Sequence, residues 1–162
     1  MSSASSGEAR RRRRLASEIK DSLRELSNQL SLLNHQVGAH LDLKDVDLDC
    51  LELITRHGPM SPSIVARRAG LHPATMTGVL DRLQRGGWIV RERDPEAADR
   101  RAVTVRALRD RNAEVFQLYS GMNTTMDDLL ADYSEADLEL LADFIQRTTT
   151  AGQSATATLA EV

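Results

Sequence analysis

The sequence predicts a mainly α-helical protein that contains one small β-hairpin. Apolar residues recur every three or four positions over residues 15–41 and 108–133, which indicates two long amphipathic helices. Between them, residues 61–85 hold two shorter helical patterns joined by a turn, and residues 88–106 hold two strand-like segments joined by a loop. This order of elements is that of a winged helix-turn-helix domain flanked by longer helices.

The first short helix is expected to begin after Ser61 and to end at Gly70. Serine is favoured at the N-cap, and Pro62 suits the first helical position. Gly70 suits the left-handed conformation that ends many helices. Leu71 then bridges a turn of about three or four residues, which is the length that a helix-turn-helix requires. The apolar face of this helix consists of Ile64, Val65 and Ala69.

The second short helix is expected over residues 73–85, between Pro73 and the Gly86-Gly87 pair. Its apolar stripe is Met76, Val79, Leu80 and Leu83, and its other surface carries Ala74, Thr75, Thr77, Gly78, Asp81, Arg82 and Arg85. That surface suits a recognition helix, because small residues let the backbone approach the bases and arginine supplies charge. A solvated amphipathic helix is the alternative. His72 occupies the N-cap position and would either contact a phosphate or have no role.

The hairpin combines strands near residues 88–93 and 102–106 with a loop from Asp94 to Arg101. Adjacent arginines at a loop tip beside a recognition helix suit a neighbouring minor groove, where the negative potential favours arginine. Asp99 could hold the Arg101 guanidinium by a charge-assisted hydrogen bond. An ordinary surface ion pair of little energetic value is the alternative for that pair.

This whole stretch resembles the DNA-binding domain of the MarR family of bacterial transcription regulators. The residues that carry the resemblance are A-R-R-A-G-L-H-P-A-T-M-T-G-V-L-D-R-L (66–83), G-G-W-I-V-R-E-R-D-P (86–95) and D-R-R-A-V-T-V (99–105). The resemblance implies that Thr75 and Thr77 face DNA and that Arg101, oriented by Asp99, forms the tip of the wing. Many members carry arginine at the position of Gly78, so this chain is expected to differ in its DNA sequence preference.

The predicted DNA-binding set combines the two short helices with the hairpin. It consists of Ser61, Ser63, His72, Pro73, Ala74, Thr75, Thr77, Gly78, Arg82, Arg85, Arg91, Arg93, Asp99, Arg100 and Arg101. Charge supports this location although the formal net charge is −3. Residues 55–111 hold 12 arginines against 6 acidic residues, a local +6, whereas residues 112–162 hold 1 basic and 9 acidic residues, a local −8. A basic middle segment beside an acidic one indicates a localised DNA-facing surface.

The flanking helices are expected to form a dimerisation lobe. The predicted organisation is a disordered Arg-rich tail (1–14), an N-terminal dimerisation helix (15–45), the winged domain (46–107), C-terminal dimerisation helices (108–147) and a flexible tail (148–162). The apolar stripes of the first and last helices exceed what one small winged domain can cover, so a two-fold dimer is favoured over an intramolecular bundle. The predicted interface residues are Leu15, Ile19, Leu23, Leu26, Leu138, Leu141 and Ile145. The Arg10–Arg14 run is either a solubilising flank or an arm that contacts phosphates.

Several classes of protein are not supported by the sequence. No apolar run approaches the roughly 20 residues that span a bilayer, and no secretory signal is visible, so the protein is expected in the bacterial cytoplasm without a membrane partner. A single cysteine excludes an internal disulfide. The sequence contains no phosphate-binding glycine loop, zinc-protease motif or hydrolase serine motif, so neither an enzyme nor a bound cofactor is expected.

The resemblance also implies a small-molecule effector in a cleft between the dimer lobe and the winged domain. His35, His40 and His57 are candidates for that cleft, although such histidines are more often packing residues. Four scattered histidines are weak support for a metal site, and Cys50 lies among leucines, where a thiol is usually inert. The favoured function is a homodimeric DNA-binding regulator, most often a repressor in this family. A winged helix used for protein–protein contact and a redox- or metal-sensing regulator are the alternatives.

Overall fold

The structure of the protein is a computed structural model that describes residues 2–93 and 102–160. The chain divides into two compact units, Met1–Leu118 and Tyr119–Val162, and each unit is described by itself. In chain order the elements are α1 (Ser2–Leu41), α2 (Asp45–His57), α3 (Pro62–Ala69), α4 (Pro73–Arg85), β1 (Ile89–Arg93), β2 (Val103–Ala107), α5 (Arg109–Ala131) and α6 (Glu135–Ala160). The predicted mainly α fold with a small β-wing is confirmed.

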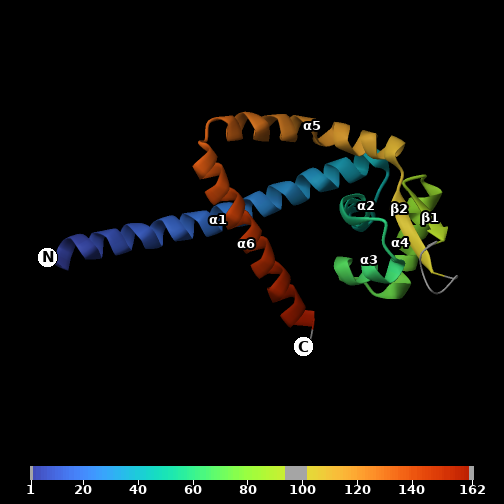
Figure 1. Ribbon diagram of the computed structural model, residues 1–162, viewed down its shortest axis with the longest axis horizontal. Coiled ribbons are helices and arrows are strands. Elements are labelled where there is room, and N and C mark those ends of the chain that lie inside the picture. Colours follow the sequence, from blue (N-terminus) through green and yellow to red (C-terminus); the bar gives the residue numbers. More distant parts are fainter. Residues whose placement is uncertain (1, 94–101, 161–162) are drawn as a thin grey trace. The chain divides into compact units, whose positions relative to one another are not determined.

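The winged domain of the first unit is built around α2, α3, α4 and the antiparallel pair β1–β2, which gather together in Figure 1. Its strands pair from Ile89 opposite Ala107 to Arg93 opposite Val103. The hydrophobic core takes side chains from all of these elements: Cys50, Leu51, Ile54, Val65, Ala66, Met76, Val79, Leu80, Leu83, Trp88, Ile89 and Val105. The four apolar residues predicted for the stripe of the second short helix are all buried.

The helix-turn-helix is bounded by the predicted local signals. The Ser61 hydroxyl accepts a hydrogen bond from the Ile64 backbone N–H at 3.4 Å, and Gly70 adopts a φ of 65° after α3. His72 caps α4, because its Nδ1 accepts a hydrogen bond from the Ala74 backbone N–H at 3.2 Å. His72 therefore has a structural role that the sequence pattern did not predict. The turn and both caps fix how α4 is presented by the domain.

A backbone bridge at Met60 extends the hairpin and was not predicted. The Val105 N–H donates to the Met60 carbonyl at 2.8 Å, and the Met60 N–H donates to the Val105 carbonyl at 3.2 Å. This pairing ties the segment between α2 and α3 to β2. It thereby fixes the position of the hairpin relative to the helix-turn-helix.

The first helix is longer than predicted. Residues 1–14 were expected to be disordered, but α1 begins at Ser2 and continues through the arginine run. Arginine, alanine and glutamate have high helix propensities, and Arg14 forms an i,i+4 ion pair with Glu18 at 3.2 Å. A run of like charges therefore does not prevent a helix in this segment.

The second unit contains the end of α5 and all of α6, joined by a capping box. The Ser134 N–H donates to the Asp137 carboxylate at 3.3 Å, and the Asp137 N–H donates to the Ser134 hydroxyl at 3.2 Å. The flexible tail predicted for residues 148–162 is wrong for most of its length, because α6 continues to Ala160. Its threonine and serine hydroxyls donate to the carbonyls four residues earlier, which satisfies them within the helix. Among the described residues, no helix is both long and apolar enough to cross a membrane.

Candidate nucleic-acid interface

The exposed face of α4 carries most of the residues that were predicted to contact DNA. His72, Pro73, Ala74, Thr75, Thr77 and Arg85 are exposed, and Gly78 is half-buried. The Thr77 hydroxyl donates to the Pro73 carbonyl at 3.1 Å, which leaves its oxygen lone pairs and its methyl group on the surface. An added Cβ at Gly78 would lie 3.5 Å from an Arg82 nitrogen, which is ordinary van der Waals contact. The helix thus presents small and hydroxyl-bearing side chains over its first two turns.

The N-terminus of α3 supplies two further predicted residues. Ser61 is half-buried and Ser63 is exposed, and their hydroxyl oxygens lie 3.0 Å apart. Because α3 packs against α4, both elements belong to one helix-turn-helix unit. Arg67 and Arg68 in the last turn of α3 are also exposed and add positive charge.

Arg82 is engaged inside the domain rather than projecting from α4. Its Nε donates to Asp47 Oδ2 at 2.8 Å, and its Nη2 donates to Asp47 Oδ1 at 2.6 Å. The Asp47 side chain on α2 is only 2 % exposed, and that of Arg82 is 36 % exposed. The hydrogen bond to Asp47 raises the pKa of the Arg82 guanidinium above its already high value. This bidentate pair holds α4 against α2, a role that the predicted DNA contact did not include.

The sequence contains a signal for the buried member of this pair. Asp47 lies four residues before Leu51 and seven before Ile54, so it falls on the buried face of α2. A carboxylate on such a face is expected to be paired, because an isolated buried charge is strongly unfavourable. Periodicity alone could not show that its partner stands 35 positions later in the chain.

The described part of the hairpin is held by two more arginine–carboxylate pairs. Arg91 on β1 donates to Asp81 on α4 at 2.7 Å, so its charge is also partly neutralised within the domain. Arg106 on β2 donates to Glu92 on β1 at 2.6 Å, and this contact holds the pKa of Glu92 below its usual value. Arg93 is exposed at the end of β1. The predicted wing residues Asp99, Arg100 and Arg101 lie outside the described residues.

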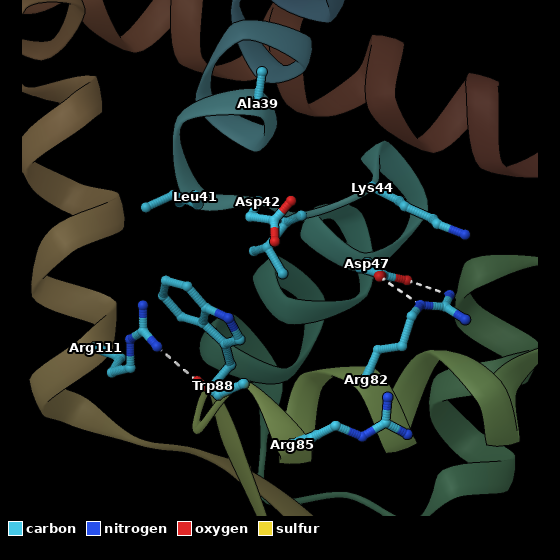
Figure 2. A pocket seen from close by; sticks show the side chains of 11 residues that line it. Ala39, Leu41, Asp42, Lys44, Asp47, Arg82, Arg85, Trp88 and Arg111 are labelled. Atoms are coloured by element: carbon cyan, nitrogen blue, oxygen red, sulfur yellow. Dashed lines mark hydrogen bonds and ion pairs between the residues drawn. The ribbon is translucent and has the colours of Figure 1, made fainter.

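An open hollow of about 710 Å³ lies behind α4 (Figure 2). Its floor includes Trp88, and the Arg111 guanidinium stacks over the indole ring at 4.0 Å from the ring centre. Arg111 also donates to the Gly86 carbonyl at 2.7 Å. Four basic and two acidic side chains border the hollow, namely Lys44, Arg82, Arg85, Arg111, Asp42 and Asp47. This excess of positive charge suits a small anion.

The three histidines that were candidates for an effector cleft do not line this hollow. His35 Nδ1 lies 3.1 Å from Asp45, and His40 Nδ1 lies 3.2 Å from the Gln36 carbonyl. His57 borders a separate hollow over α2, beside Cys50. The structure therefore does not bring the three side chains into one site. Within the described ranges, no group of three or more His, Cys, Asp and Glu side chains could hold a metal ion.

Cys50 is fully buried in the core of the winged domain. Burial, reinforced by the negative charges of Asp49 and Asp47, raises the pKa of its thiol to about 11. A thiolate is the reactive form of cysteine, so this environment disfavours reaction near neutral pH. The geometry gives no support to the redox-sensing alternative.

The residues predicted for the dimer interface remain accessible in the single chain. Leu15, Ile19 and Leu26 on α1 are exposed, and Leu23 is half-buried. On α6, Leu141 and Ile145 are exposed and Leu138 is half-buried. Exposed rows of large apolar side chains are typical of interaction surfaces.

The fold and the exposed face of α4 together define a winged helix-turn-helix protein. Residues 43–103 match the model of the MarR family. YcgE of Bacillus subtilis, an uncharacterized HTH-type transcriptional regulator, is 30 % identical over 133 residues, which cover 80 % of this chain and 85 % of YcgE. The HTH-type transcriptional repressor YetL of B. subtilis is 27 % identical over 92 residues, which cover 54 % of each chain.

Solved structures show the same fold. A mutant of MepR from S. aureus, in a structure bound to an oligodeoxyribonucleotide, aligns with a TM-score of 0.56 at 17 % identity and covers 82 % of this chain and 96 % of MepR. The chain belongs to the MarR family of transcriptional regulators, a family that is not composed of enzymes.

Proposed function

We propose that this chain is a homodimeric, sequence-specific DNA-binding repressor that acts in the bacterial cytoplasm. The observation that carries the proposal is the exposed N-terminal half of α4, where small and hydroxyl-bearing residues occupy the surface and a histidine caps the helix. An α-helix of this kind fits the major groove, and its small side chains allow close approach to base edges. MepR, whose structure includes an oligodeoxyribonucleotide, has the same fold, and the name of YetL identifies that relative as a repressor.

The roles within the predicted DNA-binding set follow from their contacts. Thr75 and Thr77 are proposed to read bases, while Ser61, Ser63 and Arg85 are proposed to contact the DNA phosphate backbone. The wing, led by Arg101, is proposed to enter the minor groove. Arg82 and Arg91 are instead proposed to position α4 and β1, since each already binds a carboxylate. Two recognition helices in a two-fold dimer would read half-sites roughly 34–36 Å apart.

The test is fluorescence anisotropy with labelled DNA from the region upstream of the protein's own gene, at physiological salt and with excess competitor DNA. We expect tight binding that survives the competitor. Arg101→Ala should weaken binding to all sequences and reduce the slope of log K against log salt by about one for each phosphate that Arg101 neutralises. Thr75→Ala should instead change the preference among operator variants.

Arg147→Ala is the matched control, because it removes one arginine charge from α6, outside the winged domain. It should leave DNA affinity unchanged. Wild-type binding no tighter than binding to random DNA would favour the competing class, a winged helix used as a protein–protein scaffold. Full affinity in the Arg101→Ala variant would overturn the proposed role of the wing.

A small organic anion is the proposed effector, and the hollow behind α4 is its proposed site in place of the histidines. Arg82 and Arg85 reach this hollow from α4 itself, so a bound anion would act directly on the recognition helix (Figure 2). Trp88 is the chain's single tryptophan and borders the hollow, so its fluorescence reports occupancy. Titration with small carboxylates should change this fluorescence in the wild type and require higher concentrations in Arg85→Gln. Equal responses in both proteins would exclude Arg85 from the site.

A further inference from the structure

Two exposed charge clusters of opposite sign stand at the ends of the long helices and take no part in the winged domain. The α1 cluster is Arg10 to Arg14, all exposed on consecutive positions. Arg14 pairs with Glu18, and no described carboxylate lies within ion-pair distance of the other four arginines. The α5–α6 cluster contains seven acidic residues and no basic residue between positions 127 and 143: Asp127, Asp128, Asp132, Glu135, Asp137, Glu139 and Asp143.

Most of the acidic cluster also lacks a cation. Asp143 lies 3.4 Å from Arg147, and Asp137 binds Ser134 in the capping box. For the remaining five carboxylates, no described basic side chain lies within ion-pair distance, and all five are exposed. Each cluster therefore leaves a like-charge repulsion that an oppositely charged surface would relieve.

Each cluster lies beside an exposed apolar row on a long helix. Arg12 lies three residues before Leu15 and seven before Ile19, so it extends the row on α1. Asp128 directly precedes Leu129 on α5, and Asp132 directly follows the last residue of α5, so both border the row on that helix. Both rows are open to solvent, with Leu15 44 % and Leu129 55 % exposed.

The two rows are similar in length. The exposed row on α1 runs from Leu15 to Leu30, and that on α5 runs from Leu118 to Leu130, so their ends are fifteen and twelve positions apart. At about 1.5 Å per residue the rows are roughly 22 Å and 18 Å long. Antiparallel packing would bring the arginine end of α1 to the acidic end of α5. Parallel packing would bring those arginines towards residues 55–111, which carry a formal +6.

We infer that the Arg10–Arg14 cluster of one copy docks on the acidic α5–α6 cluster of a second copy and sets the antiparallel direction of the dimer. The inference rests on the proposed dimer and adds the residues that select its register. Apolar rows are tolerant of sliding and of reversal, whereas misplaced charges are penalised, so charge supplies specificity that the leucines lack. Two-fold symmetry makes this contact twice in each dimer.

The test uses two complementary variants with different affinity tags, mixed at about 0.1 M salt and analysed by native mass spectrometry. One variant carries Arg11→Glu and Arg12→Glu, and the other carries Asp128→Arg and Asp132→Arg. Each variant alone opposes like charges at both contacts, so its dimer Kd should rise by about tenfold or more. In the mixed dimer both contacts regain opposite charges, and its Kd should return to within about threefold of the wild-type value.

Lys20→Glu with Arg24→Glu is the matched control. It makes the same change of charge on α1 but on the side away from the apolar row, and it should alter the dimer Kd by no more than about twofold. A statistical mixture of the two homodimers and the heterodimer would overturn the inference. Homodimers that are weakened and are not rescued by mixing would also overturn the inference, because that result would place the contact within one chain.

Loss of DNA affinity in the Arg11→Glu, Arg12→Glu variant with an unchanged dimer Kd would also overturn the inference, and would assign the cluster to DNA phosphates. A monomeric wild-type protein would instead contradict the proposed function itself. The two failures are therefore distinguishable in one series of measurements.

Discussion

The buried pair between Asp47 and Arg82 predicts an unequal response to the loss of either partner. Arg82→Ala leaves the Asp47 carboxylate, 2 % exposed, without its cation inside the domain. Removing one partner of a buried pair typically costs about 3–5 kcal/mol, because the remaining charge is uncompensated. We therefore expect Arg82→Ala to lower the free energy of unfolding by about 3 kcal/mol, the lower end of that range, because Arg82 is partly exposed in the wild type and its pair is already partly screened.

Asp47→Asn should be less damaging. The amide keeps the volume of the carboxylate and removes the buried charge, while the Arg82 side chain, 36 % exposed, can turn its guanidinium to solvent. The substitution weakens two charge-assisted hydrogen bonds and should lower the free energy of unfolding by about 1–2 kcal/mol, after allowance for the exposure of Arg82. Replacing both residues, as in Asp47→Leu with Arg82→Met, should bring stability back to within about 1 kcal/mol of the wild type.

Urea unfolding followed by Trp88 fluorescence measures these differences, because Trp88 is buried and is the only tryptophan. Protein concentration must be held constant, since the proposed dimer would unfold at a concentration-dependent midpoint. Arg147→Ala, which breaks an exposed i,i+4 pair with Asp143, is the control and should change stability by less than about 0.5 kcal/mol. If Arg82→Ala were no more destabilising than Asp47→Asn, the assignment of Asp47 as the buried, dependent partner would be wrong.

Two further predictions use the same protein. Gly78→Ala should raise the free energy of unfolding by about 0.5–1 kcal/mol, since an added Cβ meets only the Arg82 side chain at 3.5 Å. Gly70→Ala should lower the free energy of unfolding, because Gly70 has a φ of 65°. A destabilised Gly78→Ala variant would contradict this interpretation of α4. Because the pKa of Cys50 is raised to about 11, alkylation of the native protein by iodoacetamide at pH 8 should be at least about a hundredfold slower than alkylation in urea. The free energy of unfolding should fall as pH rises from the ordinary thiol pKa towards 11, because in that range the unfolded state binds fewer protons than the native state. Rapid native alkylation at pH 8 would contradict the second prediction.

The elements of the winged domain were predictable because their boundaries are encoded locally. Ser61-Pro62 begins α3, Gly70 ends it, and Gly86-Gly87 follows α4, so each boundary fell within one or two residues of the structure. These signals act through backbone conformation and capping hydrogen bonds, which depend on few neighbours. The extents of α1 and α6 were not predicted, because α1 continues through the serines and glycine of residues 2–7 and α6 continues through Gly152, which are residue types that often mark a helix end.

The candidate site was less predictable, since solvent exposure depends on contacts between distant segments. The exposed positions of α4 followed correctly from its period, but Arg82 and Arg91 are held by Asp47 and Asp81 on other elements. The hollow behind α4 likewise combines α1, α2, α4 and α5. Periodicity identifies which face of a helix is buried, and it does not identify what lies opposite that face.

These interactions explain how a helix with a weak intrinsic tendency to form can present a recognition surface. Thr75, Thr77, Gly78 and Val79 all have lower helix propensities than alanine, and they fall within five consecutive positions of α4. The helix is stabilised from behind by its buried apolar stripe and by the Asp47–Arg82 and Asp81–Arg91 pairs. The small residues that are proposed to approach bases therefore depend on charge pairs within the domain. Stability and recognition should consequently separate by residue, with Arg82→Ala lowering the free energy of unfolding and Thr75→Ala leaving it nearly unchanged.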